Sequence, residues 1–296
     1  MKKALLLINN FSGNSRRFTK NEKAIRQRLN SSYDIIREKH IEKGQTVDVN
    51  EESKDCEAVI VCGGDGTLNR TINFLKDRLH EMELVYIPTG TSNELGHRLK
   101  CDYSLQGKVA EYPLTVGFVD GRMFLDAAVV GIFALTGPKT PPEQKHKFKQ
   151  FAFFLHFFSE FRNWRINIKI ENNRGISTEG TFSFFMLNTC GSALGIKLVK
   201  RNEIPQGCFV GIRAPRKKGV LGVISELYSI ICVMAKGFKK EYDNKRAVFT
   251  RFDDLKLTFK EKTEGALDGE TFTFEPGTID ASARLGYFRL HYYKKV

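Results

Sequence analysis

Apolar runs alternate with helix-like patterns in the first part of the chain. The strand-like runs lie at residues 4–8, 33–37, 58–62 and 84–87, and the clearest helical pattern lies at 18–29. Strands separated by helices predict a parallel sheet with crossover helices. We therefore expect a Rossmann-like, three-layer α/β domain over residues 1–118.

The later part of the chain has a different pattern. Residues 164–171 and 255–260 alternate strictly between apolar and polar side chains, which predicts half-buried strands. Further strand-like runs lie at residues 180–187, 208–213, 247–252, 271–275 and 286–293. Many short alternating strands predict an antiparallel β-sandwich, which we place at residues 119–296.

Two helix-like stretches in the later part are unusually apolar. Residues 145–164 contain seven phenylalanines, with lysines at 145, 147 and 149. Such a helix suits packing against the sandwich or contact with an anionic membrane surface. Residues 220–235 are also apolar. This stretch falls short of the roughly 20 residues that span a bilayer, so we expect a buried or interfacial helix.

A glycine-rich turn follows the third predicted strand, where residues 59–69 read VIVCGGDGTLN. A strand that runs through such a turn into a helix offers backbone N–H groups and the positive helix end to a phosphate. We expect Gly63, Gly64 and Gly66 to adopt positive φ or to allow close approach of a ligand. Thr67 is a candidate for the helix cap or a phosphate contact. The simpler alternative is an ordinary tight turn.

Asp65 lies in the middle of this turn. A bare carboxylate beside phosphates would be repelled, so its presence needs an explanation. Three roles stay open: it binds Mg²⁺, it accepts a proton, or it orients the glycine loop.

Two other predicted strands also end in small, hydroxyl-bearing loops, at residues 9–13 and 88–93. In an open α/β sheet, ligands bind outside the carboxyl ends of the strands. Phosphate contacts are therefore expected from all three loops and from the start of the following helix. The candidates are Asn9, Asn10, Ser12, Gly13, Gly63, Gly64, Asp65, Gly66, Thr67, Asn69, Thr89, Gly90, Thr91 and Asn93.

A second acidic motif, ALDGE, lies far along the chain at residues 266–270. By itself the Asp268-Gly269 dipeptide favours a β-hairpin turn. The combination of GGDGTLN, PTGTSN and ALDGE, in this order, resembles the diacylglycerol kinase catalytic family, which includes bacterial lipid kinases and sphingosine kinases. GGDGT also occurs in NAD kinases and 6-phosphofructokinases, whereas the late DGE separates the lipid kinases from them.

The resemblance implies an ATP-dependent transferase of phospholipid metabolism that phosphorylates a lipid alcohol. It implies the two-domain plan above and an active site in the interdomain cleft, and it allows the last strand to return to the first domain. It assigns Glu270 as the proton acceptor, with Asp65 as the alternative. Asp268 would hold its loop or bind metal through water. Mg²⁺ is expected to arrive with ATP, near Asp65 or Asp268.

The chain departs from the family pattern at several positions. Glu94 replaces an aspartate, and residues 204–208 lack the aspartate of a structural Mg²⁺ site, which we therefore do not expect here. Residues 130–134 lack an acidic residue, and residues 38–40 replace a nucleotide-contacting threonine. The missing aspartates motivate a second hypothesis, a catalytically impaired lipid- or nucleotide-binding relative, although the retained GGDGT and DGE motifs argue against it. A soluble-substrate kinase such as an NAD kinase is the third.

Composition narrows the partners. The net charge is +13, from 47 basic and 34 acidic residues, which favours anionic partners. No helix-turn-helix, RNA-binding aromatic motif or zinc pattern is present in the sequence, so we expect no nucleic acid. A lipid alcohol and a transient anionic membrane surface are the expected partners, and a homodimer is left open. Six cysteines without CxxC spacing and no signal peptide predict a cytoplasmic, peripheral protein.

Overall fold

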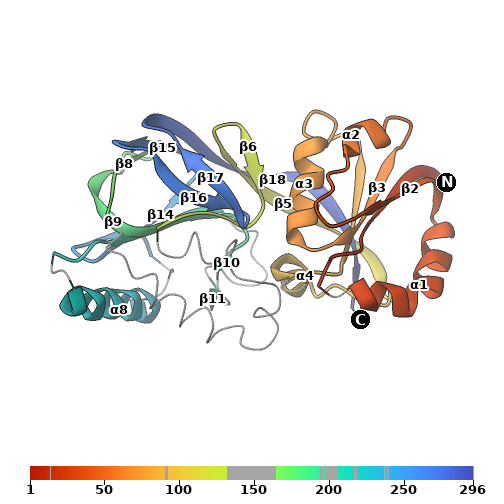
Figure 1. The fold of residues 1–296 in the computed structure, drawn as a ribbon, viewed down its shortest axis with the longest axis horizontal. Helices are drawn as coiled ribbons and strands as arrows, with labels where there is room; N and C mark the ends of the chain where they lie inside the picture. Colours follow the sequence, from red (N-terminus) through yellow and green to blue (C-terminus); the bar gives the residue numbers. More distant parts are fainter. Residues whose placement is uncertain are drawn as a thin grey trace. The chain divides into compact units, whose positions relative to one another are not determined.

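The computed structural model describes residues 1–13, 15–90, 93–131, 165–193, 196–197, 206–216, 219–236, 238 and 240–295. The chain forms two compact units (Figure 1). The first unit comprises Met1–Thr115 and Leu285–Val296, and the second comprises Val116–Arg284.

A parallel sheet forms the centre of the first unit. Its strands lie in the order β2-β1-β3-β4, and residues 290–292 of β18 pair in parallel with β4. The strands are β1 (Lys2–Asn9), β2 (Tyr33–Ile41), β3 (Ala58–Gly63), β4 (Glu83–Pro88) and β18 (Gly277–Lys294). The helices are α1 (Ser15–Asn30), α2 (Val49–Glu52), α3 (Asp65–Phe74) and α4 (Glu94–Leu99).

Both faces of this sheet are covered. The successive residues Leu5, Leu6 and Leu7 of β1 are all buried, although neighbours on a strand point to opposite faces. Figure 1 shows α1 and α3 on opposite sides of the sheet. Burial on both sides explains why the inner strands β1, β3 and β4 are continuous apolar runs, and it confirms the predicted three-layer α/β domain.

Antiparallel strands dominate the second unit. The order along the sheet is β13-β14-β12-β9-β8-β15-β18, while β7 pairs with β9 and β16, and β16 pairs with β17. The strands are β5 (Lys108–Val119), β6 (Arg122–Phe124), β7 (Ala127–Gly131), β8 (Ile166–Asn172), β9 (Ser177–Asn188), β10 (Ser192–Ala193), β11 (Ile196–Lys197), β12 (Gly207–Arg213), β13 (Tyr242–Asp243), β14 (Ala247–Phe252), β15 (Asp254–Phe259), β16 (Thr263–Leu267) and β17 (Glu270–Phe274).

Phenylalanines fill the core between these strands. Phe182, Phe185, Phe209, Phe252 and Phe274 come from four different strands and are fully buried in one cluster. Residues of β14 and of β18, which are distant along the strand order, both contribute to this cluster, so the strands curl around it. The observation confirms the predicted strand-rich second domain.

One long helix, α8 (Gly219–Lys236), belongs to the second unit and packs against β12. Its Val233 joins a second apolar cluster with Ile212 and Phe249. Within the part of the chain that the structure describes, no helix is long and apolar enough to cross a bilayer. The aromatic stretch at residues 145–164 lies outside the described residues.

Candidate functional site

Three loops are hydrogen-bonded to one another where β1, β3 and β4 end, at the carboxyl edge of the parallel sheet. Asn9 Nδ2 donates to Thr67 Oγ1 at 2.8 Å, and Thr89 Oγ1 donates to Ser12 Oγ at 3.1 Å. The backbone N–H of Thr89 donates to the carbonyl oxygen of Gly63 at 2.7 Å. We call the described residues of these loops, 9–13, 63–67, 88–90 and 93, the three-loop cluster.

Glycines let two of these loops touch through their backbones. A Cβ added at Gly90 would lie 2.5 Å from the Cα of Gly64, and one added at Gly63 would lie 2.5 Å from Thr67 Cβ. Neither Gly63, Gly64 nor Gly66 has positive φ, so that expectation is wrong. The strand continues in extended form through Gly64 (φ −89°, ψ −179°) into α3. Gly63 and Gly64 are instead crowded by Thr67 and Gly90, and close approach of a ligand stays a prediction.

Asp65 joins the second loop to the third. Its Oδ1 accepts a hydrogen bond from the Tyr86 hydroxyl at 2.8 Å, and its Oδ2 accepts one from the backbone N–H of Glu94 at 2.7 Å. Glu94 is the first residue of α4, whose N-cap Asn93 makes no side-chain capping bond. The Asp65 carboxylate therefore takes the capping role from a distant loop, which is the orienting role among the three left open.

Tyr86 was not predicted as a site residue. It lies in the apolar strand β4 and is fully buried. Burial, together with the charge of Asp65, raises the pKa of Tyr86 well above its ordinary value, so the hydroxyl stays protonated and donates. A lone hydroxyl within a buried strand was the only signal in the sequence.

The N-terminus of α3 fits an anionic ligand. Its N-cap, Gly64, has no side chain that could accept hydrogen bonds from the first turn. The backbone N–H groups of a helix's first turn lack intrahelical partners. A Cβ added at Gly66 would meet no described atom within 4 Å. In the same cluster Asn93 donates to the carbonyl oxygen of Gly90 at 2.7 Å, while its buried Oδ1 has no partner among the described residues. These features suit the phosphates of a nucleotide.

Asn10 lies at the edge of the cluster, beside the end of β2. Its Nδ2 donates to Glu42 Oε1 at 2.7 Å, and its Oδ1 lies 3.2 Å from His40 Nδ1. All three residues are exposed. Asn10 therefore links the first loop to β2 rather than to the other loops.

Three further candidates of the first unit are not partners in the bonds given above. Asn69 Oδ1 accepts from Asn73 Nδ2 at 2.8 Å, one turn along α3. Gly13 is exposed, and Thr91 lies outside the described residues.

The late acidic motif forms a hairpin in the second unit. Leu267 pairs with Glu270, and the two residues between them, Asp268 (φ 48°) and Gly269 (φ 84°), connect β16 to β17. Positive φ at both central positions is the geometry of a type I′ turn, for which Asp-Gly is favoured. The dipeptide is thus a hairpin turn, and Glu270 follows it at the exposed start of β17.

The Asp268 side chain fixes this hairpin to a neighbouring segment. Its Oδ2 accepts from the backbone N–H of Leu125 at 2.7 Å, and its Oδ1 accepts from those of Asp126 and Ala127 at 2.9 Å each. Asp268 N–H donates in return to the carbonyl oxygen of Ala127 at 2.9 Å. Of the two roles expected for Asp268, the geometry supports holding the loop. Asp126, whose backbone N–H is one of these donors, was not predicted as a site residue. Its signal in the sequence was an acidic side chain directly before the apolar residues 127–130.

Asp268→Asn is expected to lower the stability of the chain. The amide turns one of its polar atoms into a donor facing backbone donors, which costs about 2 kcal/mol, or a fall of about 4–8 °C in the unfolding midpoint. Calorimetry would measure the change, with Glu264→Gln on the exposed side of β16 as the control. An unchanged midpoint in Asp268→Asn would contradict the anchoring role.

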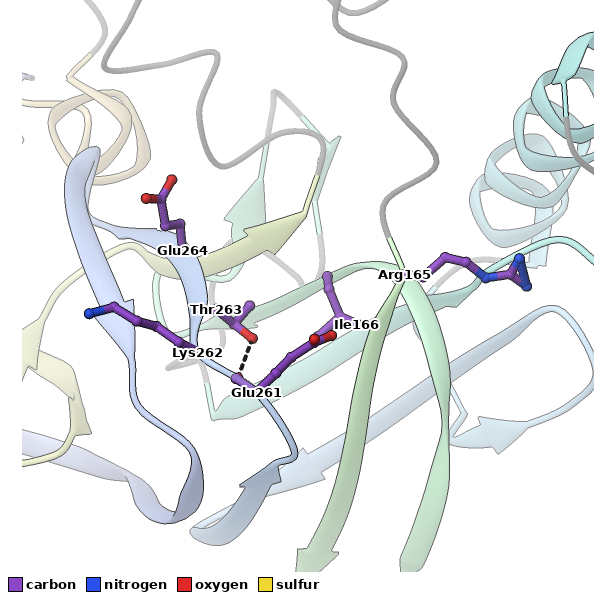
Figure 2. A pocket seen from close by; sticks show the side chains of 6 residues that line it. All are labelled: Arg165, Ile166, Glu261, Lys262, Thr263 and Glu264. Atoms are coloured by element: carbon purple, nitrogen blue, oxygen red, sulfur yellow. Dashed lines mark hydrogen bonds between the residues drawn. The ribbon is translucent and has the colours of Figure 1, made fainter.

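A metal-binding cluster and a pocket are two other kinds of site that the described residues could form. Across the described ranges, no group of three or more His, Cys, Asp and Glu side chains could hold a metal ion. Residues 204–205 of the segment judged unsuited to a structural Mg²⁺ lie outside those ranges. A pocket of 380 Å³ in the second unit (Figure 2) contains none of the predicted site residues. It is lined by Arg165, Ile166, Glu261, Lys262, Thr263 and Glu264.

Comparison with known proteins gives concordant relatives. Residues 3–112 match the family described as the diacylglycerol kinase catalytic domain. A diacylglycerol kinase of Staphylococcus aureus is 24% identical over 233 residues, which cover 74% of this chain and 72% of that protein. One from Staphylococcus haemolyticus is 23% identical over 225 residues, which cover 73% of this chain and 66% of that protein, just under two thirds of its length.

Solved structures share the fold. A putative diacylglycerol kinase from Bacillus anthracis superposes with a TM-score of 0.73 at 18% identity, covering 98% of this chain and 95% of that one. An NAD kinase from Archaeoglobus fulgidus in complex with ATP superposes with a TM-score of 0.50 at 14% identity, covering 99% of this chain and 93% of that one. At these identities the likeness concerns the fold alone.

Proposed function

Because the chain belongs to the diacylglycerol kinase catalytic family, we propose that it is an ATP-dependent lipid kinase. It would transfer the γ-phosphate of ATP to the hydroxyl of diacylglycerol or a similar lipid alcohol. The observation that carries the proposal is the three-loop cluster, in which two loops touch at their glycines beside a helix end without a side-chain cap.

The three-loop cluster is the proposed nucleotide site. The strand order β2-β1-β3-β4 has its switch point between β1 and β3, where open α/β sheets bind their ligands. When bound, ATP with its Mg²⁺ supplies the phosphoryl group and most of the charge neutralisation. The backbone of residues 63–67 would hold the phosphates, with Asn9, Ser12 and Thr89 fixing the shape of the loops around them.

Asp65 is proposed as a positioning residue. Both of its carboxylate oxygens already accept hydrogen bonds within or beside the cluster, from Tyr86 and Glu94. The bonds hold the glycine loop and the start of α4 in one arrangement. In this role both carboxylate oxygens act as hydrogen-bond acceptors. Proton transfer from the acceptor hydroxyl is therefore assigned to another group.

Glu270 is proposed as the general base for the acceptor hydroxyl. It is an exposed carboxylate at the first position of β17, beside a hairpin turn that Asp268 anchors through three backbone hydrogen bonds. A base works best on a rigid support, because proton abstraction depends on a defined distance. The anchored hairpin supplies that support.

Gly66→Ala tests the phosphate site. A Cβ there has room among the described residues, and alanine is the better helix former, so the free energy of unfolding is expected to stay equal or to rise by up to about 1 kcal/mol. If phosphates lie against this turn, the methyl group raises KM for ATP by at least about tenfold, an estimate from the loss of one close contact. Steady-state kinetics and thermal unfolding would measure both changes.

Gly90→Ala is the matched comparison. Its Cβ would lie 2.5 Å from the Gly64 backbone, so this variant is expected to lose stability as well as ATP affinity. An unchanged KM in Gly66→Ala would contradict a phosphate position beside α3.

The decisive experiment is a substrate screen. The purified chain would be incubated with labelled ATP and Mg²⁺ in separate reactions. Some reactions would contain mixed micelles of one lipid alcohol, and another would contain NAD. A phosphorylated lipid supports the proposal, whereas a phosphorylated nicotinamide product would assign a soluble-substrate kinase. Phosphorylation of no alcohol class would favour the binding relative that the departure at Glu94 suggests.

A further inference from the structure

Helix α8 exposes an apolar face to solvent. Leu221, Ile224, Tyr228 and Ile231 are 59%, 57%, 53% and 61% exposed. Their spacing places them within about 80° of the helix circumference. We call these four side chains the apolar row. The other exposed large hydrophobic residues of the described chain lie on separate elements: Met1, Phe11, Ile36, Val109 and Leu285.

The opposite face of α8 is buried and combines apolar residues such as Val233 with two polar ones. Glu226 and Ser229 are 6% and 5% exposed. Glu226 hydrogen-bonds the Ser183 side chain of β9, and burial raises the pKa of Glu226. A helix adapted to water on its outer side has the reverse arrangement, with its carboxylate outside and its isoleucines inside. The buried polar contacts fix the rotation of α8 that leaves the apolar row outside.

One cation contacts the apolar row, and others flank α8 in the sequence. Basic residues flank α8 in the sequence, in the segments 213–218 and 236–240. Arg216 and Lys240 are exposed, and the Arg246 guanidinium lies 4.5 Å from the centre of the Tyr228 ring. Glu226 is the one acid within the sequence of α8, and it is buried. An apolar strip with cationic margins and no exposed acid on the helix matches an anionic lipid surface.

We propose that the apolar row of α8 docks on an anionic phospholipid bilayer, with its side chains among the headgroups and with Arg216, Lys240 and Arg246 against lipid phosphates. The inference rests on the proposed function in one respect: it describes how the enzyme reaches an acceptor that resides in a membrane. A second copy of the chain fits this face less well. A symmetric contact would bring two sets of the same basic segments together, in a chain of net charge +13.

Vesicle binding of the full chain without nucleotide tests the docking. The probes are vesicles of phosphatidylcholine alone and of phosphatidylcholine with phosphatidylserine. We expect at least about tenfold stronger binding to the anionic vesicles, decreasing as salt screens the cations. Hydrogen exchange of the unmodified chain is expected to show added protection within residues 219–236 when these vesicles are present. Equal binding to both vesicle types without such protection would overturn the proposal.

A paired substitution locates the surface. Ile224→Asp with Ile231→Asp is expected to weaken anionic vesicle binding at least about tenfold. The control, Ile36→Asp with Leu285→Asp, adds the same charge at positions that are 41% and 54% exposed, and it should weaken binding much less. Equal losses in both pairs would overturn the assignment to α8. A change from dimer to monomer with unaltered vesicle binding would assign the face to a second copy.

Kinetics separate this inference from the proposed function. The α8 pair should keep its turnover on a short-chain acceptor dissolved as monomers and lose at least about tenfold on the same acceptor class in vesicles. Vesicle binding that depends on α8 without phosphorylation of any lipid would overturn the kinase proposal alone. Lipid phosphorylation with vesicle binding insensitive to α8 would overturn the docking proposal alone.

Discussion

Glu270→Gln is expected to reduce turnover at least about 10²-fold, the lower end of what a general base contributes. Glutamine keeps the size of the side chain and removes its capacity to accept a proton. KM for ATP should change by less than about twofold, because Glu270 is not part of the three-loop cluster that we assign to the nucleotide. Initial rates with labelled ATP and a lipid acceptor would measure both constants.

Two comparisons give this result its meaning. Glu264→Gln makes the same chemical change on the exposed side of the neighbouring strand β16 and should keep normal turnover. The unfolding midpoint of Glu270→Gln should equal that of the unmodified chain, which excludes loss of the hairpin as the cause. Near-normal turnover in Glu270→Gln would remove Glu270 as the proton acceptor and return that role to Asp65.

The parallel sheet of the first unit was predictable because its signal is local. Strands expected at residues 58–62 and 84–87 are observed as β3 (Ala58–Gly63) and β4 (Glu83–Pro88). Burial on both faces demands continuous apolar runs, and such runs are visible without knowledge of any partner strand. The glycine-rich turns that follow the strands were visible for the same reason.

Strand partners in the second unit were not predictable. Alternation with a period of two indicates which face of a strand is buried, but it does not identify the neighbouring strand. β9 pairs with β7, β8 and β12, so one run of residues serves three partners. β18 runs over Gly277–Lys294, whereas the pattern predicted only its second half, because residues 277–285 alternate weakly.

The motifs of the candidate site were visible in the sequence, but their contacts were not. Asp65 is connected to Tyr86, which is indistinguishable from an ordinary core residue in an apolar run. Asp268 binds backbone N–H groups that lie 141 to 143 positions earlier in the chain. The Asp268 contacts leave no residue pattern, because backbone donors are the same at every position. Close approach of Gly64 and Gly90 is equally invisible until the loops are placed in space.

Asp65→Asn is expected to reduce kcat/KM for ATP at least about 10²-fold and to lower the free energy of unfolding by about 1–3 kcal/mol. The carboxylate accepts two hydrogen bonds, from the Tyr86 hydroxyl and the Glu94 N–H. An amide has one acceptor oxygen, so its NH₂ group must face one of these donors. The bonds also lose their charge assistance, so the second and third loops are no longer held together.

Controls separate this bracing role from a chemical one. Tyr86→Phe removes one of the two hydrogen bonds, so it should lower stability by about 1 kcal/mol and kcat/KM by a smaller factor than Asp65→Asn. Asp77→Asn, at an exposed position just beyond α3, should change neither. Loss of activity in Asp65→Asn at full stability, with normal kinetics in Tyr86→Phe, would contradict bracing. It would place Asp65 among the groups that act on the substrate, because the connection between the loops would then contribute nothing to catalysis.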